Sequence, residues 1–462
     1  MSNHQPNHNN FTSKIGLILA TAGSAVGLGN IWRFPVLAGQ NGGAAFLILY
    51  IFCVILIGLP LMVGEFIIGR HAQSNTAYAF SKLTNHKIFK NIGRFGVFTG
   101  WFILCYYIVV SAWALDYLVD AILGRFGKLS EAGNAQVYAD YFHDFITNPY
   151  LPVIYTIIFI LLSHLIIIRG VKKGIEKFAK FLMPLLFIIM LILVIFSIFT
   201  EGAQEGLTFL FKPDFTKITF STILTAMGQA FFSMSIAMGC LCTFASYFTK
   251  EANLINTAFK VGVIDTLVAV MSGIIIFPAV FSAHFAVNSG ASLAFIALPN
   301  VFQQAFSHLP TVSYIISILF YFLLVLATLT SVISLHEVPT AFLAEHYKIS
   351  RTKATSIVTA TVCFFGTICS LSNGVLSDIT ISGKNIFDLF DFVSGQIFLP
   401  IGGLLIAVFV GWSMDKDIIR NQLTNFGTIP GKGATTIIYL LKYVIPVITL
   451  LIFLSGLNII KL

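Results

Sequence analysis

Two apolar stretches of the sequence are interrupted by small residues at positions where an unwound backbone could bind ions. The first reads ATAGSAVGLGNIWRFP and contains Gly23 and Gly29, and the second reads AMGQAFFSMSIAMG and contains Ser233 and Gly239. Glycine inside a helix is less stable than alanine by about 1 kcal/mol. Where a helix unwinds, its free carbonyl oxygens can coordinate a cation such as Na⁺, and the N–H groups that start the next half-helix can hold a carboxylate. Such a site could bind a zwitterion and a cation together.

A second candidate group is Asp265, which lies inside the apolar stretch VGVIDTLVAV. A carboxylate is costly in lipid, so an aspartate in such a stretch is a candidate for function. The alternative is that Asp265 lies nearer a cytoplasmic opening and is simply solvated.

The composition places these residues in a membrane protein. Apolar residues make up 57% of the 462 residues and charged residues only 10%, whereas a soluble domain has about 25% charged residues. A spanning helix needs about 20 mostly apolar residues. The sequence predicts an all-α integral membrane protein with about eleven transmembrane helices, at residues 15–37, 44–69, 95–123, 150–168, 178–199, 218–247, 258–287, 312–343, 354–371, 387–413 and 435–458.

The two interrupted stretches are the first and the sixth of these spans. They are corresponding members of two halves of five spans, which is the pattern of transporters with inverted repeats and broken helices. The alternative is ordinary packing of small residues between helices. We expect a tail at 1–14, a first repeat at 15–200, a second at 201–413, and a loop with the eleventh helix at 414–462.

The basic residues predict the orientation in the membrane. With the N-terminus in the cytoplasm, most of the 27 Lys and Arg residues fall in cytoplasmic segments, as the positive-inside rule requires. Topology therefore explains the net charge of +8, and there is no reason to propose a nucleic-acid partner. No secretory signal peptide is expected at the N-terminus.

Four motifs resemble the neurotransmitter:sodium symporter family, and its bacterial leucine and multihydrophobic amino-acid transporters most closely. They are GLILATAGSAVGLGNIWRFP with NGGAAF (16–46), GQAFFSMSIAMG (228–239), ATLTS (327–331) and LFDF (389–392). The resemblance implies a 5+5 inverted repeat with broken helices 1 and 6 in a bacterial plasma membrane. It also implies alternating-access symport of a neutral amino acid with two Na⁺ ions per substrate, by a monomer or a homodimer.

The resemblance implies a sodium site of neutral oxygens. Its ligands would be the carbonyls of Gly23, Val26 and Ala327 and the hydroxyls of Thr330 and Ser331. Oxygen ligands suit a hard cation, and a neutral ligand set favours its release. Taken alone, the two hydroxyls could instead bond back to their own helix.

The other sodium site would contain the carboxylate of the bound substrate. The resemblance assigns to it the Ala25 carbonyl and the side chains of Asn30, Ser233 and Asp265. The position of Asp265 is often Asn in the family, and animal members bind chloride nearby. A fixed carboxylate could supply that negative charge, so we expect transport without chloride.

The substrate site implied by the resemblance combines backbone N–H groups with an uncharged pocket. Its residues would be Ala25, Leu28, Gly29, Tyr107, Phe232, Ser233, Ser235, Met238, Ser331 and Leu335. The flexible side chain of Met238 adapts to varied shapes. We therefore expect a large hydrophobic or aromatic L-amino acid.

Gates are expected on both sides of this pocket. The resemblance implies an outer gate between Arg33 and Asp391, and an inner gate at Glu345 with His8 in place of the usual arginine. Gly174 and Pro184, which have nine residues between them, match a spacing associated with unwinding of the fifth span. A simple helix entry and kink is the alternative.

Other classes of function are less compatible with the sequence. The motifs of metalloproteases, serine hydrolases and P-loops are absent, so we do not expect an enzyme, and there is no selectivity-filter loop of a channel. A sensor that binds without transporting remains open, as does proton coupling through Asp265 or Glu337. His336 and Glu337 could be polar contacts between helices or a proton path.

Overall fold

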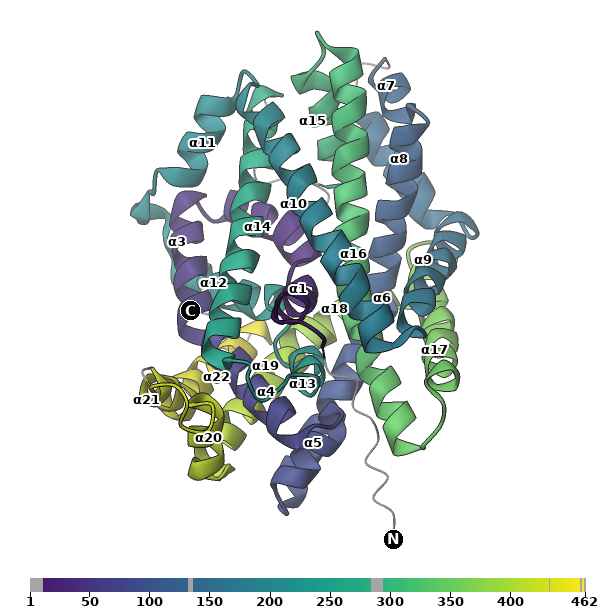
Figure 1. The fold of residues 1–462 in the computed structure, drawn as a ribbon. Helices are drawn as coiled ribbons and strands as arrows, with labels where there is room; N and C mark the ends of the chain where they lie inside the picture. The colour runs from purple at the N-terminus through teal and green to yellow at the C-terminus, as the bar shows by residue number, and fades with distance from the viewer. Residues whose placement is uncertain (1–10, 132–135, 284–293, 432, 458, 461–462) are drawn as a thin grey trace.

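The computed structural model describes residues 11–131, 136–283, 294–431, 433–457 and 459–460. Within these ranges the regular secondary structure is helical, apart from one isolated β-bridge between Ile381 and Lys384. The helices form one upright bundle, with α5 and the start of α6 at the bottom of Figure 1 and α7 and α15 at the top. The predicted all-α class is confirmed.

The first half consists of α-helices and a few short π-helical segments, labelled η; the second half also has a 3₁₀ segment with an η label. The elements of the first half are α1 (Lys14–Ala25), η1 (Gly29–Arg33), α2 (Phe34–Gln40), α3 (Ala44–Cys53), η2 (Val54–Gly58), α4 (Leu59–Ala72), α5 (Thr76–Leu83), α6 (Lys87–Ile122), α7 (Arg125–Ser130), α8 (Gln136–Thr147), α9 (Leu151–Ile167), η3 (Val171–Glu176) and α10 (Lys177–Ile198).

The second half follows the same pattern. Its elements are α11 (Ala203–Phe211), η4 (Phe215–Lys217), α12 (Phe220–Ser233), α13 (Cys240–Ala245), α14 (Leu254–Ser282), α15 (Ala297–Ala305), α16 (Pro310–His346), α17 (Arg351–Leu371), α18 (Ile386–Phe392), η6 (Val393–Phe398), α19 (Leu399–Val408), η7 (Phe409–Ser413), α20 (Lys416–Leu423), α21 (Ala434–Tyr439), η8 (Leu440–Val444) and α22 (Ile445–Gly456).

The described helices agree with a chain that crosses a membrane many times. Eight are long and apolar enough to span by themselves, and two bent pairs raise the number to ten. The predicted sixth span is α12 and α13, which are each too short for this test because the span is broken between them. Together these elements account for about eleven spans.

Both predicted helix breaks are present. In the first span, α1 ends at Ala25, the backbone of Val26 is extended, and the chain resumes as a helix at Gly29 with a bend of 52°. In the sixth span, the residues between Ser233 and Cys240 are non-helical, and Ser235, Ala237 and Gly239 have φ of 54°, 64° and 75°. Positive φ values interrupt a right-handed helix.

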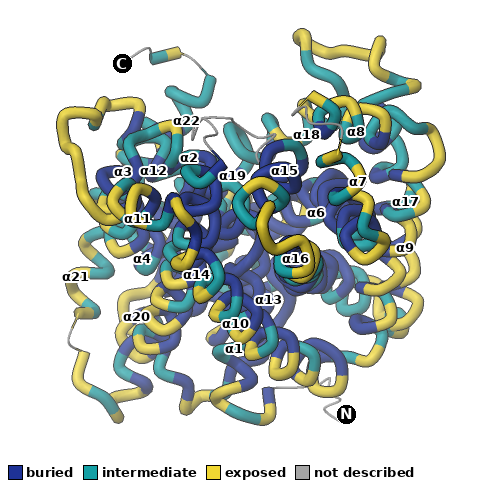
Figure 2. Tube along the Cα trace, turned by 90° about the horizontal axis from the view of Figure 1, so that it is seen from above, coloured by how far each residue is buried: buried dark blue, intermediate teal, exposed yellow. Residues whose placement is uncertain are grey.

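Burial separates the centre of the bundle from its surroundings. Figure 2 shows buried residues gathered in the middle and exposed residues around the outside. Many exposed residues are large and apolar, such as Ile188, Leu191 and Ile195 on α10. So much exposed apolar surface is compatible with lipid and not with water.

Candidate functional site

A small cavity lies where the two helix breaks meet. Its volume is about 20 Å³, room for about one water molecule, and it is lined by Ser24, Ala25, Gly27, Gly29, Ile103, Tyr107, Phe232, Ser233, Ser235, Met238, Ser331 and Leu335. All of the predicted substrate residues line it except Leu28. The Leu28 N–H instead donates to the Tyr107 hydroxyl, at 3.2 Å.

Three lining residues were missed from the sequence, namely Ser24, Gly27 and Ile103. Ile103 precedes Tyr107 by one turn of α6, so helical periodicity could have identified it. The Ser24 carbonyl accepts the Ser235 hydroxyl at 2.7 Å and thereby joins the two breaks. Such a contact between distant segments has no local signal in the sequence.

Gly27 lets the backbone approach the cavity closely. A Cβ atom at this position would lie 2.4 Å from the Ser331 Oγ and 2.9 Å from the Tyr107 Oη. Any side chain here would displace both hydroxyls. The close approach of the backbone to the cavity therefore depends on glycine at this position.

Asp265 lies at the centre of a buried polar cluster. Its Oδ1 accepts from the Asn30 Nδ2 at 2.8 Å, and its Oδ2 accepts from the Tyr50 hydroxyl at 2.6 Å and the Ser233 hydroxyl at 3.3 Å. Its exposed fraction is 0%, so the aspartate is not solvated in this conformation. Three of the four ligands predicted for this sodium site thus lie together, and the fourth, Ala25, lines the adjoining cavity.

The residues predicted for the neutral sodium site also lie together, between α1 and α16. The Val26 carbonyl accepts from the hydroxyls of Thr330 at 3.4 Å and Ser331 at 3.3 Å. The Thr330 hydroxyl also donates to the Ala327 carbonyl at 2.9 Å, so bonding back to its own helix occurs as well. A Cβ atom at Gly23 would lie 3.5 Å from the Thr330 Cβ.

The chemistry of both clusters fits a hard monovalent cation. In the described part of the chain no three His, Cys, Asp or Glu side chains are grouped as a transition metal would require. The available ligands are carbonyl, hydroxyl, amide and carboxylate oxygens, which are the donors that hard cations prefer.

A wider vestibule lies above the cavity, on the side where α6 ends. It has a volume of about 420 Å³, and Arg33, Asp391, Tyr107 and Phe232 are among its lining residues. The Arg33 guanidinium lies 4.5 Å from the centre of the Phe232 ring. Within the described residues no ion pair joins Arg33 to Asp391 within 4.0 Å. The predicted outer-gate residues share the vestibule but are not paired in this conformation.

The opposite side of the cavity is closed by the N-terminal segment. Phe11 is buried against aromatic rings of the chain that follows α13, and its N–H donates to the Tyr247 carbonyl at 3.1 Å. Glu345 accepts from the Asn75 backbone N–H at 2.8 Å and the Asn75 Nδ2 at 2.7 Å. His8 lies outside the described residues, so its pairing with Glu345 stays a prediction.

The Gly174–Pro184 segment is wound as a helix, with η3 leading into α10. Glu176 in η3 accepts from the Thr12 N–H at 2.8 Å and the Thr12 hydroxyl at 2.6 Å, and it pairs with Lys180 at 2.7 Å. The predicted unwinding motif is therefore held to the N-terminal segment. In this conformation it forms a helix entry, which was the alternative interpretation.

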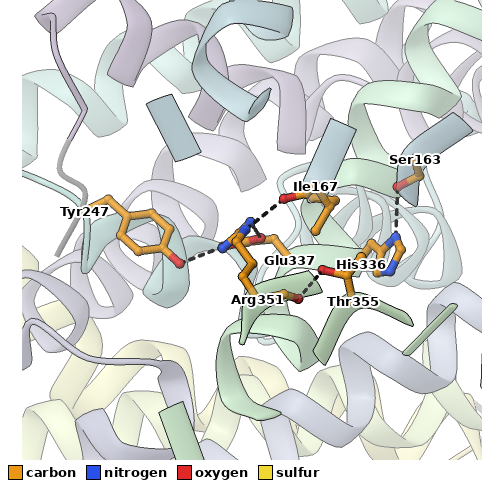
Figure 3. A network of polar contacts seen from close by, with 7 residues as sticks. All are labelled: Ser163, Ile167, Tyr247, His336, Glu337, Arg351 and Thr355. Atoms are coloured by element: carbon orange, nitrogen blue, oxygen red, sulfur yellow. Dashed lines mark hydrogen bonds and ion pairs between the residues drawn. The ribbon is translucent and has the colours of Figure 1, made fainter. Parts of the chain in front are cut away.

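The buried carboxylate of Glu337 has an ion-pair partner, the half-buried Arg351. Arg351 binds both of its carboxylate oxygens (Figure 3). The Tyr247 hydroxyl donates to the Glu337 Oε1 at 2.7 Å. Arg351 also donates through Nε to the Ile167 carbonyl, at 2.8 Å. Glu337 and Arg351 together thus form a polar contact between helices. It connects α16 and α17 with the end of α9 and with the chain that follows α13.

His336 and Glu65 have polar partners too. The His336 Nδ1 lies 3.0 Å from the Ser163 hydroxyl (Figure 3). Glu65 accepts from the N–H of Ala237 at 2.7 Å and the N–H of Cys242 at 3.3 Å. Its carboxylate therefore binds the unwound backbone of the sixth span, a role that the sequence did not indicate.

Comparisons with known proteins identify relatives along almost the whole chain. The profile of the sodium:neurotransmitter symporter family matches residues 8–129 and 143–461. The sodium-dependent transporter YhdH of Bacillus subtilis is 36% identical over 98% of each chain. A sodium-dependent transporter of Haemophilus influenzae is 35% identical over 99% of this chain and 100% of its own. The crystal structure of MhsT in complex with L-phenylalanine has 40% sequence identity and a TM-score of 0.87, over 97% of this chain and 99% of the other.

Proposed function

This chain belongs to the sodium:neurotransmitter symporter family, and we propose that it imports a neutral, large hydrophobic or aromatic L-amino acid. The family assignment establishes a sodium-coupled amino-acid transporter and not an enzyme. The identity of the amino acid, the number of sodium ions and independence from chloride are the finer parts of the proposal.

The observation that carries the proposal is the chemistry of the central cavity. One end has backbone N–H groups and the Tyr107 hydroxyl, which suit a carboxylate. The other walls include Ile103, Phe232, Met238 and Leu335, and no charged side chain lines the cavity. A charged substrate side chain would be buried there without a partner, which is costly. The similarity to MhsT, solved with L-phenylalanine, supports the same substrate class.

Two sodium ions are proposed per amino acid, one at each oxygen cluster. The cluster around Asp265 adjoins the cavity, so the substrate carboxylate can complete the shell of the first ion. The cluster around Val26 and Thr330 holds the second ion with neutral ligands. The negative charge that balances the first ion comes from Asp265 itself, which removes the need for chloride.

Transport would proceed by alternating access in a bacterial plasma membrane, with the N-terminus in the cytoplasm. The vestibule then faces outward, and the segment around Phe11 covers the inner side. Binding of Na⁺ and amino acid closes the vestibule over Phe232, and release of the N-terminal segment opens the path inward. The two five-helix repeats, at 15–200 and 201–413, supply the two moving parts.

The test is uptake of radiolabelled amino acids into proteoliposomes, with sodium outside and potassium inside. We expect accumulation of large hydrophobic amino acids that requires sodium and persists when gluconate replaces chloride. Binding without accumulation would indicate a sensor. Uptake driven by a proton gradient alone would reject the sodium sites, and loss of uptake in gluconate would reject independence from chloride.

A further inference from the structure

A groove on the outside of the bundle lies between α6, α16 and α17, towards the end where α5 lies. It has a volume of about 360 Å³ and is lined by Arg94, Val97, Phe98, Trp101, Pro339, Phe342, Leu343, Ile357, Val358 and Thr361. It shares no lining residue with the central cavity or the vestibule. All three helices are long and apolar enough to span a membrane, so hydrocarbon would surround the groove.

The walls of the groove suit a hydrocarbon chain. Phe98 is 46% exposed and Ile357 is 41% exposed, one on each side. The indole N–H of Trp101 donates to the Thr361 hydroxyl at 3.1 Å, and that hydroxyl donates to the Val358 carbonyl at 2.9 Å. The polar atoms of the wall are therefore already satisfied, and the surface that remains is apolar.

One end of the groove is basic. Arg94 is exposed, and Lys90 precedes it by one turn on the same face of α6. The Arg94 guanidinium donates a hydrogen bond to the neutral Asn91 Oδ1, at 3.4 Å. Across the described ranges no carboxylate lies within 4.0 Å of Arg94 as an ion pair. A planar guanidinium in this position can form two hydrogen bonds with a phosphate group.

We propose that this groove binds an anionic phospholipid, with the headgroup phosphate on Arg94 and one acyl chain along Phe98, Trp101 and Ile357. Basic pockets between transmembrane helices are known to hold anionic headgroups. The charge and the apolar walls follow each other along α6 in the order that a headgroup and its chain require. The lipid belongs to the leaflet on the side of α5, which is the cytoplasmic leaflet in the proposed orientation.

The position of the groove links the lipid to the central cavity. On its other face, α6 packs against the break in the sixth span, where a Cβ atom at Gly100 would lie 2.6 Å from the Met238 carbonyl oxygen. Pro339 in the groove wall is one turn beyond Leu335, which lines the cavity, on the same helix. A bound lipid would thus support two helices that shape the substrate pocket, and we expect it to increase the affinity for the amino acid.

The test is native mass spectrometry of the purified full chain titrated with dioleoylphosphatidylglycerol, and with dioleoylphosphatidylcholine for comparison. We expect tighter binding of the anionic lipid and about fivefold weaker binding in Arg94→Gln. Arg94→Lys should recover most of the affinity, and Ile357→Trp, which fills the groove, should weaken both lipids. The matched controls are Arg420→Gln on α20 and Ile188→Trp on α10, both exposed, and they should bind lipid as the wild type does.

Other outcomes would overturn the proposal. Equal binding of the two lipids, or unchanged binding in Arg94→Gln and Ile357→Trp, would reject it. A dimer that Ile357→Trp dissociates would assign the groove to a second copy of the chain. If inorganic phosphate binds at Arg94 as tightly as phosphatidylglycerol does, the groove would hold an anion without its lipid chain.

A second measurement detects contact between the lipid and the groove wall directly, because Trp101 lines the groove. Phosphatidylglycerol with brominated acyl chains should quench the tryptophan fluorescence of the wild type, and most of the quenched signal should disappear in Trp101→Phe. Quenching that remains in Trp101→Phe would place the lipid elsewhere.

Discussion

At the residue scale, the site depends on two residues whose surroundings leave little room for substitution, Asp265 and Gly27. Asp265 is fully buried and accepts hydrogen bonds from three side chains on three different elements. Gly27 has no room for a methyl group. The first residue supplies charge and the second supplies access to the backbone, so each is testable by one conservative substitution.

Replacement of Asp265 by Asn keeps the shape of the side chain and removes its charge. Because hydrogen bonds and ion contacts to a charged group contribute about 1.5–3 kcal/mol, we expect the sodium concentration for half-maximal uptake to rise by about tenfold or more. Sodium titration of uptake in proteoliposomes measures this. Asp378→Asn, in an exposed turn, is the control. An unchanged sodium dependence in Asp265→Asn would show that Asp265 is not a sodium ligand.

Replacement of Gly27 by Ala places a methyl group 2.4 Å from the Ser331 Oγ. Overpacking of this kind costs about 1–3 kcal/mol, so we expect amino-acid binding about five- to hundredfold weaker. Equilibrium binding of radiolabelled L-phenylalanine checks this. Gly64→Ala is a matched control, since its Cβ would meet atoms no nearer than 3.6 Å. Equal affinities for both variants would contradict the proposed geometry.

At the scale of the elements, the ends of broken and π-helical segments are held by buried acids. Glu65 binds the unwound backbone of the sixth span, and Glu176 binds the N-terminal segment to η3. A carboxylate that accepts backbone N–H groups stabilises one arrangement of two elements without joining them covalently. In the proposed transport cycle, the contact between Glu176 and the N-terminal segment would break when the inner side opens.

Replacement of Glu176 by Gln should loosen the N-terminal segment. The variant loses the ion pair with Lys180 and charge-assisted hydrogen bonds from Thr12, so residues 11–20 and 171–180 should exchange amide hydrogens about tenfold faster or more. Hydrogen exchange with mass spectrometry measures this by peptide. Glu205→Gln, at an exposed position of α11, is the control and should leave both segments protected from exchange. Protection equal to wild type in Glu176→Gln would exclude Glu176 as the contact that holds the segment.

At the scale of the whole molecule, the segment around Phe11 covers one end of the central cavity, and the proposed outer gate at the other end is unpaired. Arg33 lies over Phe232 rather than against Asp391, beside a vestibule of about 420 Å³. The central cavity has room for about one water molecule, so side chains must move for an amino acid to enter. Ligand binding should therefore change the populations of two conformations.

The outer vestibule should close when sodium and amino acid bind together. A cysteine at Leu37, which lines the vestibule, should react with a membrane-impermeant thiol reagent about tenfold more slowly in sodium and L-phenylalanine than in potassium, a change of about 1.4 kcal/mol in the population of the open state. The native cysteines provide a low background, because five are buried and Cys363 is half-buried. A rate that sodium and L-phenylalanine do not alter would contradict closure of the vestibule.

The sequence alone predicted the features that depend on local chemistry. The transmembrane spans were recognised as apolar stretches long enough to cross the hydrocarbon core of a membrane. The two breaks were recognised from small residues such as Gly29 and Gly239, which disfavour a helix. The candidate ligands were assigned by resemblance to a family, and the structure places most of them in contact.

The tertiary structure alone decided which distant groups meet. Glu65 had no partner in the sequence because its contacts, Ala237 and Cys242, lie more than 170 residues away. The same is true of the Ser24 carbonyl, which accepts the hydroxyl of the distant Ser235, and of the groove beside Arg94. The unpaired outer gate is also a property of the conformation, because the same residues can be paired or apart. Spacing along the chain sets the local backbone preference, whereas packing of separate helices sets the partners of a buried charge.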